Sequence, residues 1–181
     1  MKFQEILRKA ANRIEKYPEE YDWLNPTMCN CGIVAQVASG LNNEQLWSKI
    51  HEEEWKGWSG SSGFSYAPGS IGPFTCPISQ LSSDNIFYIL RKAGFNGKDI
   101  VNLETLFDRK IRAKAGLYVC ECPQLNYLHY SDYDNPISTV KYMRAMANMR
   151  DKQEKCKNQK SADVIYKKPL RQNHSLVLET I

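Results

Sequence analysis

Apolar residues recur three and four positions apart along most of this chain, and that spacing restricts the folds open to it. Near the start, Phe3, Ile6, Leu7, Ala10 and Ile14 fall on one side of a helix, and charged residues lie between them. Such a pattern is typical of a helix that packs one face against a core. The same spacing predicts five more helices, at 31–40, 43–56, 83–94, 102–116 and 136–150.

Residues with strong local preferences mark the ends of these helices. A helix often begins after a residue whose side chain accepts hydrogen bonds from the first-turn amides. The residues expected in this N-cap role are Asn43, Ser83, Asn102 and Asn135. A helix often ends at a glycine in the left-handed conformation. The glycines expected in this role are Gly40, Gly94 and Gly116. In the last helix the expected buried residues are Ile137, Val140, Met143 and Ala147.

Two regions have the alternation of strands instead. The strings LYVCEC and LNYLHY flank a Pro-Gln pair and predict a small hairpin over residues 117–130. The final NHSLVLETI is a second candidate strand, with ADVIYKK at 162–168 as its partner. We therefore expect an α+β fold that is mainly helical, with five or six helices and a small antiparallel β element.

Charge is distributed unevenly along the chain. The formal net charge is +4, yet residues 141–171 alone contain ten basic and three acidic side chains. We expect a mainly helical globular domain at 1–150 and a basic C-terminal extension at 151–181, either strand or flexible. Clustered positive charge also suits nucleic acid, which residues 141–171 would contact. We prefer a solvated helix end and tail, because no groove-reading motif is present.

The composition and the first residues indicate a cytoplasmic protein. With 42% hydrophobic and 11% aromatic residues, the chain can bury a core and is not a disordered class. No apolar run approaches the roughly 20 residues that span a bilayer, and residues 1–17 lack the pattern of a secretory signal. We expect no membrane partner. In the cytoplasm the six cysteines would be reduced, as thiols, nucleophiles or metal ligands.

The string MCNCGIVAQ carries the sharpest chemical hypothesis. If a helix begins at Asn30 or Cys31, the Cys31 thiol lies in the first turn, where the helix dipole favours a thiolate. Gly32 would let a substrate or another backbone come close. A cysteine that opens a buried helix resembles the nucleophile position of papain-like cysteine hydrolases and amidases. The alternative is that Cys31 and Gly32 are small residues at a tight helix start.

A nucleophilic cysteine needs a base and a binding surface. His129 is the best-placed base, and Asp132 or Asp134 could orient its ring. Residues expected to contact a substrate are Gly32, Gln36, Trp58, Phe64 and Tyr66. The last three belong to a long loop rich in glycine, serine and proline, of a length that usually has a function. This hypothesis needs no cofactor.

The same cysteines are also candidate zinc ligands. Thiolates favour a tetrahedral zinc site, and the candidate ligands are Cys29, Cys31, Cys76, Cys120 and Cys122. Structural zinc sites usually separate paired cysteines by two to four residues, whereas both pairs here have the C-x-C spacing. Zinc is therefore the alternative reading of this cysteine set.

The motif also resembles one found in a group of uncharacterised bacterial proteins of similar length. The similarity consists of C-N-C-G-x-x-A-Q, a later C-P and then L-E-x-L-x-D. It implies no known activity, but it suggests one site formed by Cys29, Cys31, Gly32, Gln36, Cys76 and Pro77. Two functions follow as hypotheses. One is a cysteine-dependent hydrolase or acyl transferase acting on an amide; the other is a non-enzymatic binding module with a structural or zinc-binding cysteine cluster.

Overall fold

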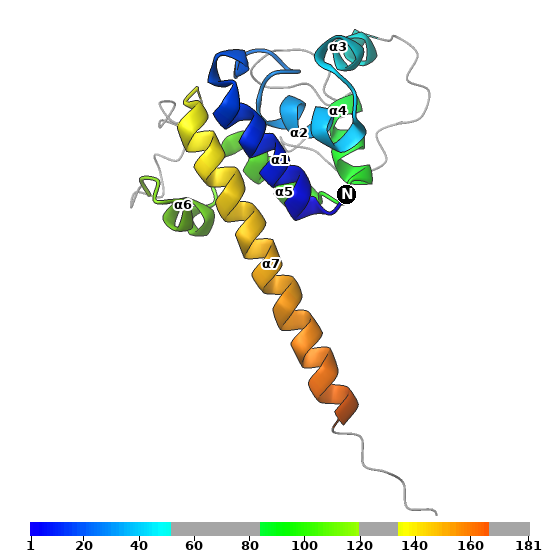
Figure 1. Ribbon diagram of the computed structural model, residues 1–181, viewed down its shortest axis with the longest axis vertical. Helices are drawn as coiled ribbons and strands as arrows, with labels where there is room; N and C mark the ends of the chain where they lie inside the picture. The colour runs from blue at the N-terminus through cyan, green and yellow to red at the C-terminus, as the bar shows by residue number, and fades with distance from the viewer. Residues whose placement is uncertain (52–83, 120–133, 167–181) are drawn as a thin grey trace, which may run out of the picture.

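The computed structural model describes residues 1–51, 84–119 and 134–166, and these form a mainly helical fold (Figure 1). The expected helical class is therefore confirmed. The elements are α1 (Phe3–Lys16), the 3-10 helix η1 (Pro18–Glu20), α2 (Asn30–Ser39), α3 (Asn43–His51), α4 (Asp84–Lys92), α5 (Gly97–Thr105), α6 (Arg109–Ala115) and α7 (Pro136–Tyr166). The described residues contain no strand.

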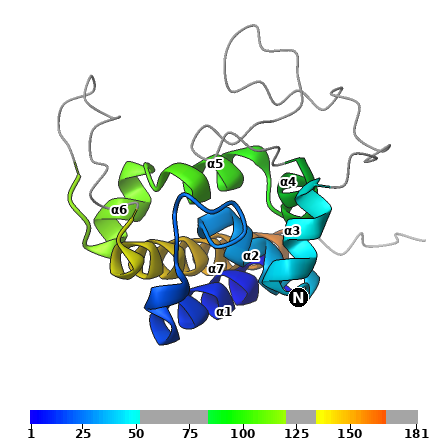
Figure 2. The ribbon, with the colours of Figure 1, turned by 90° about the horizontal axis from the view of Figure 1, so that it is seen from above.

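Helix α2 lies in the middle of the fold, where it contacts α1, α3, α4 and α5 (Figure 2). All of its residues from Asn30 to Gln36 are buried. These seven consecutive residues cover all sides of α2, and most of them are small or apolar. This is the pattern of a helix that other helices enclose. The cysteine motif is thus part of the core rather than part of a surface loop.

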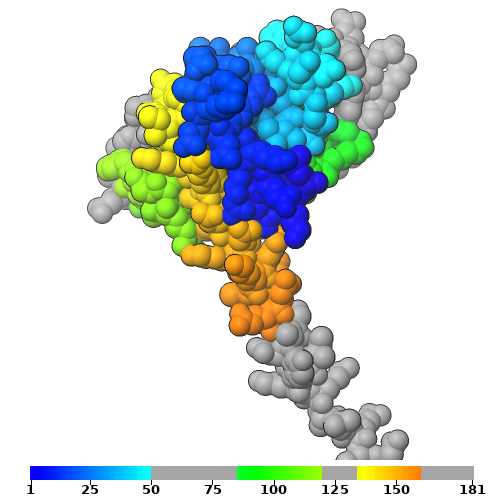
Figure 3. Space-filling view, in the orientation of Figure 1, coloured from blue at the N-terminus to red at the C-terminus, as the bar shows by residue number. Residues whose placement is uncertain are grey.

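Helices α1 and α7 pack along each other and form the longest contact in the fold (Figure 1). Ile6, Leu7 and Ala10 on α1 are buried, as are Met143 and Ala147 on α7. At 31 residues, α7 is about 46 Å long at 1.5 Å per residue. Its second half projects from the body (Figure 3), and residues 152–159 are all exposed. No helix in the described part of the chain has the length and apolar character to cross a membrane.

Several helix ends lie where the sequence predicts them. Gly40 and Gly116 have left-handed φ angles of 75° and 66° and cap α2 and α6. The Asn135 Oδ1 accepts hydrogen bonds from the amides of Ile137 and Ser138, at 2.9 and 3.2 Å, so the Asn-Pro pair does begin α7. These predictions are confirmed because local hydrogen bonding alone decides them.

Other helix boundaries differ from those that the sequence predicts. Asn42, not Asn43, caps α3, since the Asn42 Oδ1 accepts from the Gln45 amide at 2.8 Å. The single helix expected at 102–116 is two helices, of which α5 is capped by Asn96 and α6 by Asp108. The split raises the number of α-helices in the described residues to seven, more than the five or six expected.

Two expectations for the C-terminal part also need correction. Ile137 is 64% exposed rather than buried: Ser138 and Thr139 in the same turn of α7 are buried, so Ile137 lies on the outward side of the helix. Residues 162–166 belong to α7, so they are helical and not a strand. Of the predicted hairpin at 117–130, only 117–119 are described, and they are not a strand; Ser83 and the final candidate strand lie outside the described residues.

A surface ion pair between α1 and α7 gives a prediction. Arg144 donates to both carboxylate oxygens of Glu15, at 2.8 and 2.6 Å. This hydrogen bonding lowers the pKa of Glu15, so its contribution to stability is present above the unfolded pKa and is lost as the pH falls through the folded value. We expect Arg144→Gln to raise the Glu15 pKa toward its ordinary value in a carboxyl NMR titration. Lys9→Gln is the control on α1, and an unchanged Glu15 pKa in Arg144→Gln would contradict the assignment.

Candidate functional site

The loop between η1 and α2 packs directly against α2 at Gly32. A Cβ atom at Gly32 would lie 2.3 Å from the Pro26 carbonyl oxygen and 2.5 Å from that of Thr27. Both distances are far below van der Waals contact, and the neighbouring atoms are backbone. Gly32 is therefore required for the close approach of this loop, which is one of the two roles that the sequence suggests for it.

Gln36 lies one turn after Gly32 on the same side of α2 and also holds the loop. Its Nε2 donates to the Thr27 carbonyl oxygen at 2.7 Å, and its Oε1 accepts from Arg13 Nη1 at 2.8 Å. Arg13 also donates from Nη2 to a Glu20 carboxylate oxygen at 3.3 Å. Gln36 is 2% exposed, so a buried amide connects the loop to an arginine at the surface.

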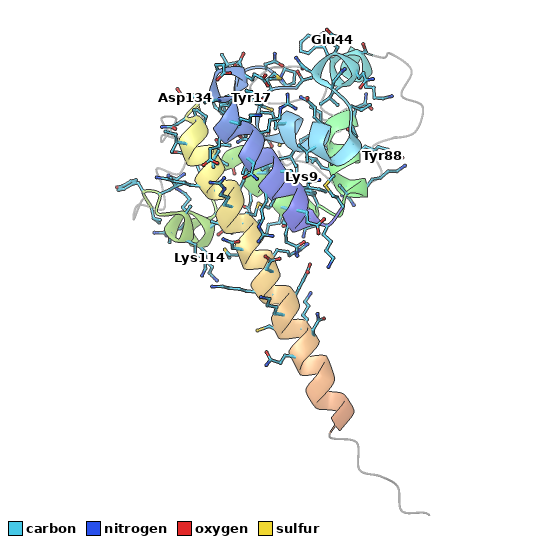
Figure 4. The ribbon with its side chains drawn as sticks, viewed as in Figure 1. Lys9, Tyr17, Glu44, Tyr88, Lys114 and Asp134 are labelled. Atoms are coloured by element: carbon cyan, nitrogen blue, oxygen red, sulfur yellow. The ribbon has the colours of Figure 1, made fainter. Side chains whose placement is uncertain are left out.

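A pocket of about 520 Å³ opens beside this arginine. Its lining comes from α1, η1, the loop, α2 and the start of α3, and comprises Arg13, Glu20, Met28, Gln36, Asn42, Asn43 and Glu44. Glu44 lies on α3 at the edge of the fold (Figure 4). The volume lies within the range of roughly 300–1000 Å³ that is typical of small-molecule sites. Charges of both signs and one thioether line this pocket.

Both cysteines of the motif lie at the start of α2. Cys29 occupies the N-cap and is half-buried, and its thiol donates to the Pro26 carbonyl oxygen at 3.5 Å. Cys31 is the second residue of the helix, as the sequence predicts, and is 6% exposed as part of the hydrophobic core. The dipole of α2 would favour a thiolate at either position.

Next to these cysteines, a buried tyrosine joins the first turns of two helices. The Tyr21 hydroxyl donates to Asn30 Oδ1 at 2.7 Å, so at 3.2 Å it accepts from the Thr139 hydroxyl on α7. Asn30 Nδ2 donates in turn to the Leu103 carbonyl oxygen of α5, at 3.0 Å. Burial raises the pKa of Tyr21, an effect that the Thr139 hydrogen bond partly offsets, so the phenol stays protonated and acts as a donor.

Cys31 and Gln36 therefore lie on different sides of α2. Gln36 is five positions after Cys31, and at about 100° per residue the two lie about 140° apart around α2. Gln36 lines the pocket and Cys31 does not. Gly32 and Gln36 bind the loop, whereas Cys31 lies in the core beside Tyr21; that the motif forms one site with Cys76 and Pro77 stays a prediction, since those two residues lie outside the described residues.

Most of the remaining predicted site residues lie outside the part of the chain that the structure describes. Asp134 is described: it is exposed, and it lies just before α7 (Figure 4). Its charge is one of those that raise the Tyr21 pKa, after burial and with Cys29 and Cys31. Outside the described residues lie His129, Asp132, Trp58, Phe64, Tyr66, Cys76, Pro77, Cys120 and Cys122. Among the described residues, no three histidine, cysteine or acidic side chains converge as a metal site.

Sequence reasoning did not identify the pocket. Arg13, Glu20 and Glu44 are ordinary charged residues on separate elements, and no spacing relates them. It likewise did not identify Tyr21 or Thr139. The only sequence signal was Gln36, an amide in an otherwise apolar helix, because a buried amide needs hydrogen-bond partners from elsewhere in the fold.

Comparison with known proteins adds no relationship to these observations. No family model matches this chain, and no curated protein or solved structure matches it significantly.

Proposed function

We propose that this chain is a small-molecule-binding module and that the pocket beside Gln36 is its binding site. The observation that carries the proposal is the pair of hydrogen bonds made by the Gln36 amide, to Arg13 at 2.8 Å and to the loop at 2.7 Å. They fix one cationic side chain at the wall of a cavity large enough for a ligand.

Fixing Arg13 before a ligand arrives favours binding. An unrestrained arginine loses side-chain entropy when it binds a ligand, on the order of 0.5–1.5 kcal/mol for such a residue. Arg13 already contacts Gln36 and Glu20, and 30% of its side chain remains exposed. A guanidinium has five N–H donors, so others remain for a ligand group.

Under this proposal the C-N-C-G-x-x-A-Q motif is architectural. Asn30 connects α2 to Tyr21 and α5, while Gly32 and Gln36 hold the loop that forms one wall of the pocket. Cys31 packs in the core. The cysteines then act as compact apolar residues, and the binding function needs no metal.

One observation favours a second candidate, cysteine-dependent hydrolysis or acyl transfer at an amide. Cys31 is in the first turn of α2, and the Tyr21 hydroxyl connects that turn to the first turn of α7. Two positive helix ends near one thiol would stabilise a thiolate nucleophile. In this candidate His129 is the base, and Asp132 or Asp134 orients it; zinc bound by the cysteine set remains the alternative use of these thiols.

Thiol reactivity separates the two candidates. The binding proposal predicts that Cys31, at 6% exposed, reacts with iodoacetamide at least about tenfold more slowly than the exposed Cys156. Peptide mapping by mass spectrometry measures each site separately. Faster reaction at Cys31 than at Cys156 near pH 6, well below the ordinary thiol pKa of about 8.5, would support the nucleophile instead.

The binding proposal itself is tested by site-resolved NMR. Uniformly ¹⁵N-labelled protein is titrated with a library of amino acids, short peptides, carboxylic acids, sugars and nucleotides. We expect at least one class to shift the signals of Arg13, Gln36 and Glu44 together. If no compound shifts these signals, or if the shifts gather around Tyr21 and Cys31, the pocket is not the functional site.

A further inference from the structure

The pocket carries charges of both signs at its walls. Arg13 supplies one positive charge, and Glu20 and Glu44 supply two negative charges. A ligand with several negative charges would meet a lining whose net charge is −1, and an uncharged ligand would displace water from these charged groups without offering them an opposite charge. The lining suits a molecule that carries a cation and an anion at separate positions.

Arg13 is the group that would bind the anion. A guanidinium matches the planar geometry of a carboxylate and binds it through two parallel hydrogen bonds. The buried Gln36 amide holds Nη1, and Glu20 contacts only Nη2, so the guanidinium has a defined position. A carboxylate entering the pocket would meet a donor that is already in place.

Glu44 and Glu20 would bind the cation. Glu44 is exposed on α3 and makes no hydrogen bond or ion pair within the described residues. Its carboxylate can accept an ammonium without first releasing a partner from this part of the chain. Met28 adds an apolar contact to the lining, which suits an aliphatic side chain or linker.

We infer that the pocket binds a small zwitterion of the amino acid or short-peptide class. This inference rests on the proposed binding function and specifies its ligand. The ligand's carboxylate pairs with Arg13, its ammonium pairs with Glu44 and Glu20, and its apolar part contacts Met28. The volume of about 520 Å³ gives room for a dipeptide.

Calorimetric titration with three related probes tests this inference. The probes are L-alanyl-L-leucine, its N-acetyl form, which lacks the ammonium, and its C-terminal amide, which lacks the carboxylate. We expect the free dipeptide to bind at least about tenfold more tightly than either blocked form, since each blocked form leaves one charged wall unpaired. Equal binding of the N-acetyl form would overturn the inference.

Single variants then assign each charge. Arg13→Gln should weaken the free dipeptide by about tenfold and leave the weak binding of the amide unchanged. Glu44→Gln should weaken the free dipeptide by about threefold and leave the N-acetyl form unchanged. Glu44 is exposed and makes no hydrogen bond or ion pair within the described residues, so this variant stays informative even if Arg13→Gln folds poorly.

Matched controls and the library screen keep the two proposals separate. Lys9→Gln on α1 and Glu19→Gln on η1 change exposed charges outside the pocket and should leave dipeptide affinity unchanged; Figure 4 labels Lys9 on α1. If the dipeptide fails to bind while another class shifts the pocket signals, the zwitterion inference is wrong and the binding function stands. If nothing shifts them, both are wrong.

Discussion

Replacing Gly32 by alanine is expected to lower the free energy of unfolding by about 2–3 kcal/mol. The added Cβ would lie 2.3–2.5 Å from backbone atoms of Pro26 and Thr27, so either the loop or α2 must move. Alanine is favoured over glycine within helices by about 1 kcal/mol, and the expected loss is what remains after that gain. Urea denaturation measures it.

The controls for Gly32 are two glycines that end helices. Gly40 and Gly116 have positive φ angles, and among the described residues a Cβ at either would meet no atom within 4 Å beyond its own chain neighbours. Alanine there should cost only about 1 kcal/mol, because backbone conformation is the sole penalty. If Gly32→Ala were no more destabilising than Gly40→Ala, the close packing of the loop on α2 would be contradicted.

Replacing Asn30 by alanine is expected to cost about 2–3 kcal/mol. Asn30 is 1% exposed and joins three elements, by accepting from the Tyr21 hydroxyl and donating to the Leu103 carbonyl oxygen. Its removal takes the acceptor from one buried group and the donor from another, and buried polar groups without partners are costly.

Asn102 provides the matched control for Asn30. It is a half-buried asparagine in α5 and makes no side-chain hydrogen bond within the described residues. Asn102→Ala should change the free energy of unfolding by less than about 0.5 kcal/mol in the same urea experiment. A loss below about 1 kcal/mol for Asn30→Ala would mean that the Tyr21 network contributes little to the fold.

The sequence predicts those features that depend on neighbouring residues. The apolar face of α1, the glycine ends of α2 and α6 and the Asn-Pro start of α7 are all local, and the structure agrees with each. In each case the hydrogen bonds that decide the boundary join residues within one or two turns. The mainly helical class follows from the same signals.

Features decided by distant contacts are not predictable in this way. The break between α5 and α6 occurs at Leu106, a leucine with a left-handed φ of 50°. Glycine or asparagine would signal such a break, whereas leucine suggests that the helix continues. Leu106 is fully buried, and two residues later the Asp108 amide donates to the Tyr142 hydroxyl of α7 at 3.1 Å, so tertiary packing offsets the backbone strain.

The candidate site also contains both features set by neighbouring residues and features set by distant contacts. The position of Cys31 at a helix start follows from the apolar spacing of the residues after it, and the structure confirms it. The union of Arg13, Glu20 and Glu44 in one pocket depends on how α1, η1 and α3 pack, which no local spacing encodes. Gln36 belongs to both categories, as a motif residue whose partners come from distant elements.

The most direct test of the account compares two near-isosteric changes within the motif. Ligand affinity is measured for Cys31→Ser and Gln36→Met, using the compounds that shift the pocket signals of the unaltered protein. We expect Cys31→Ser to bind as the unaltered protein does, and Gln36→Met to bind at least about tenfold more weakly, because Arg13 is no longer held. Loss of binding in Cys31→Ser together with normal binding in Gln36→Met would contradict the account and would assign the function to the cysteine face of α2.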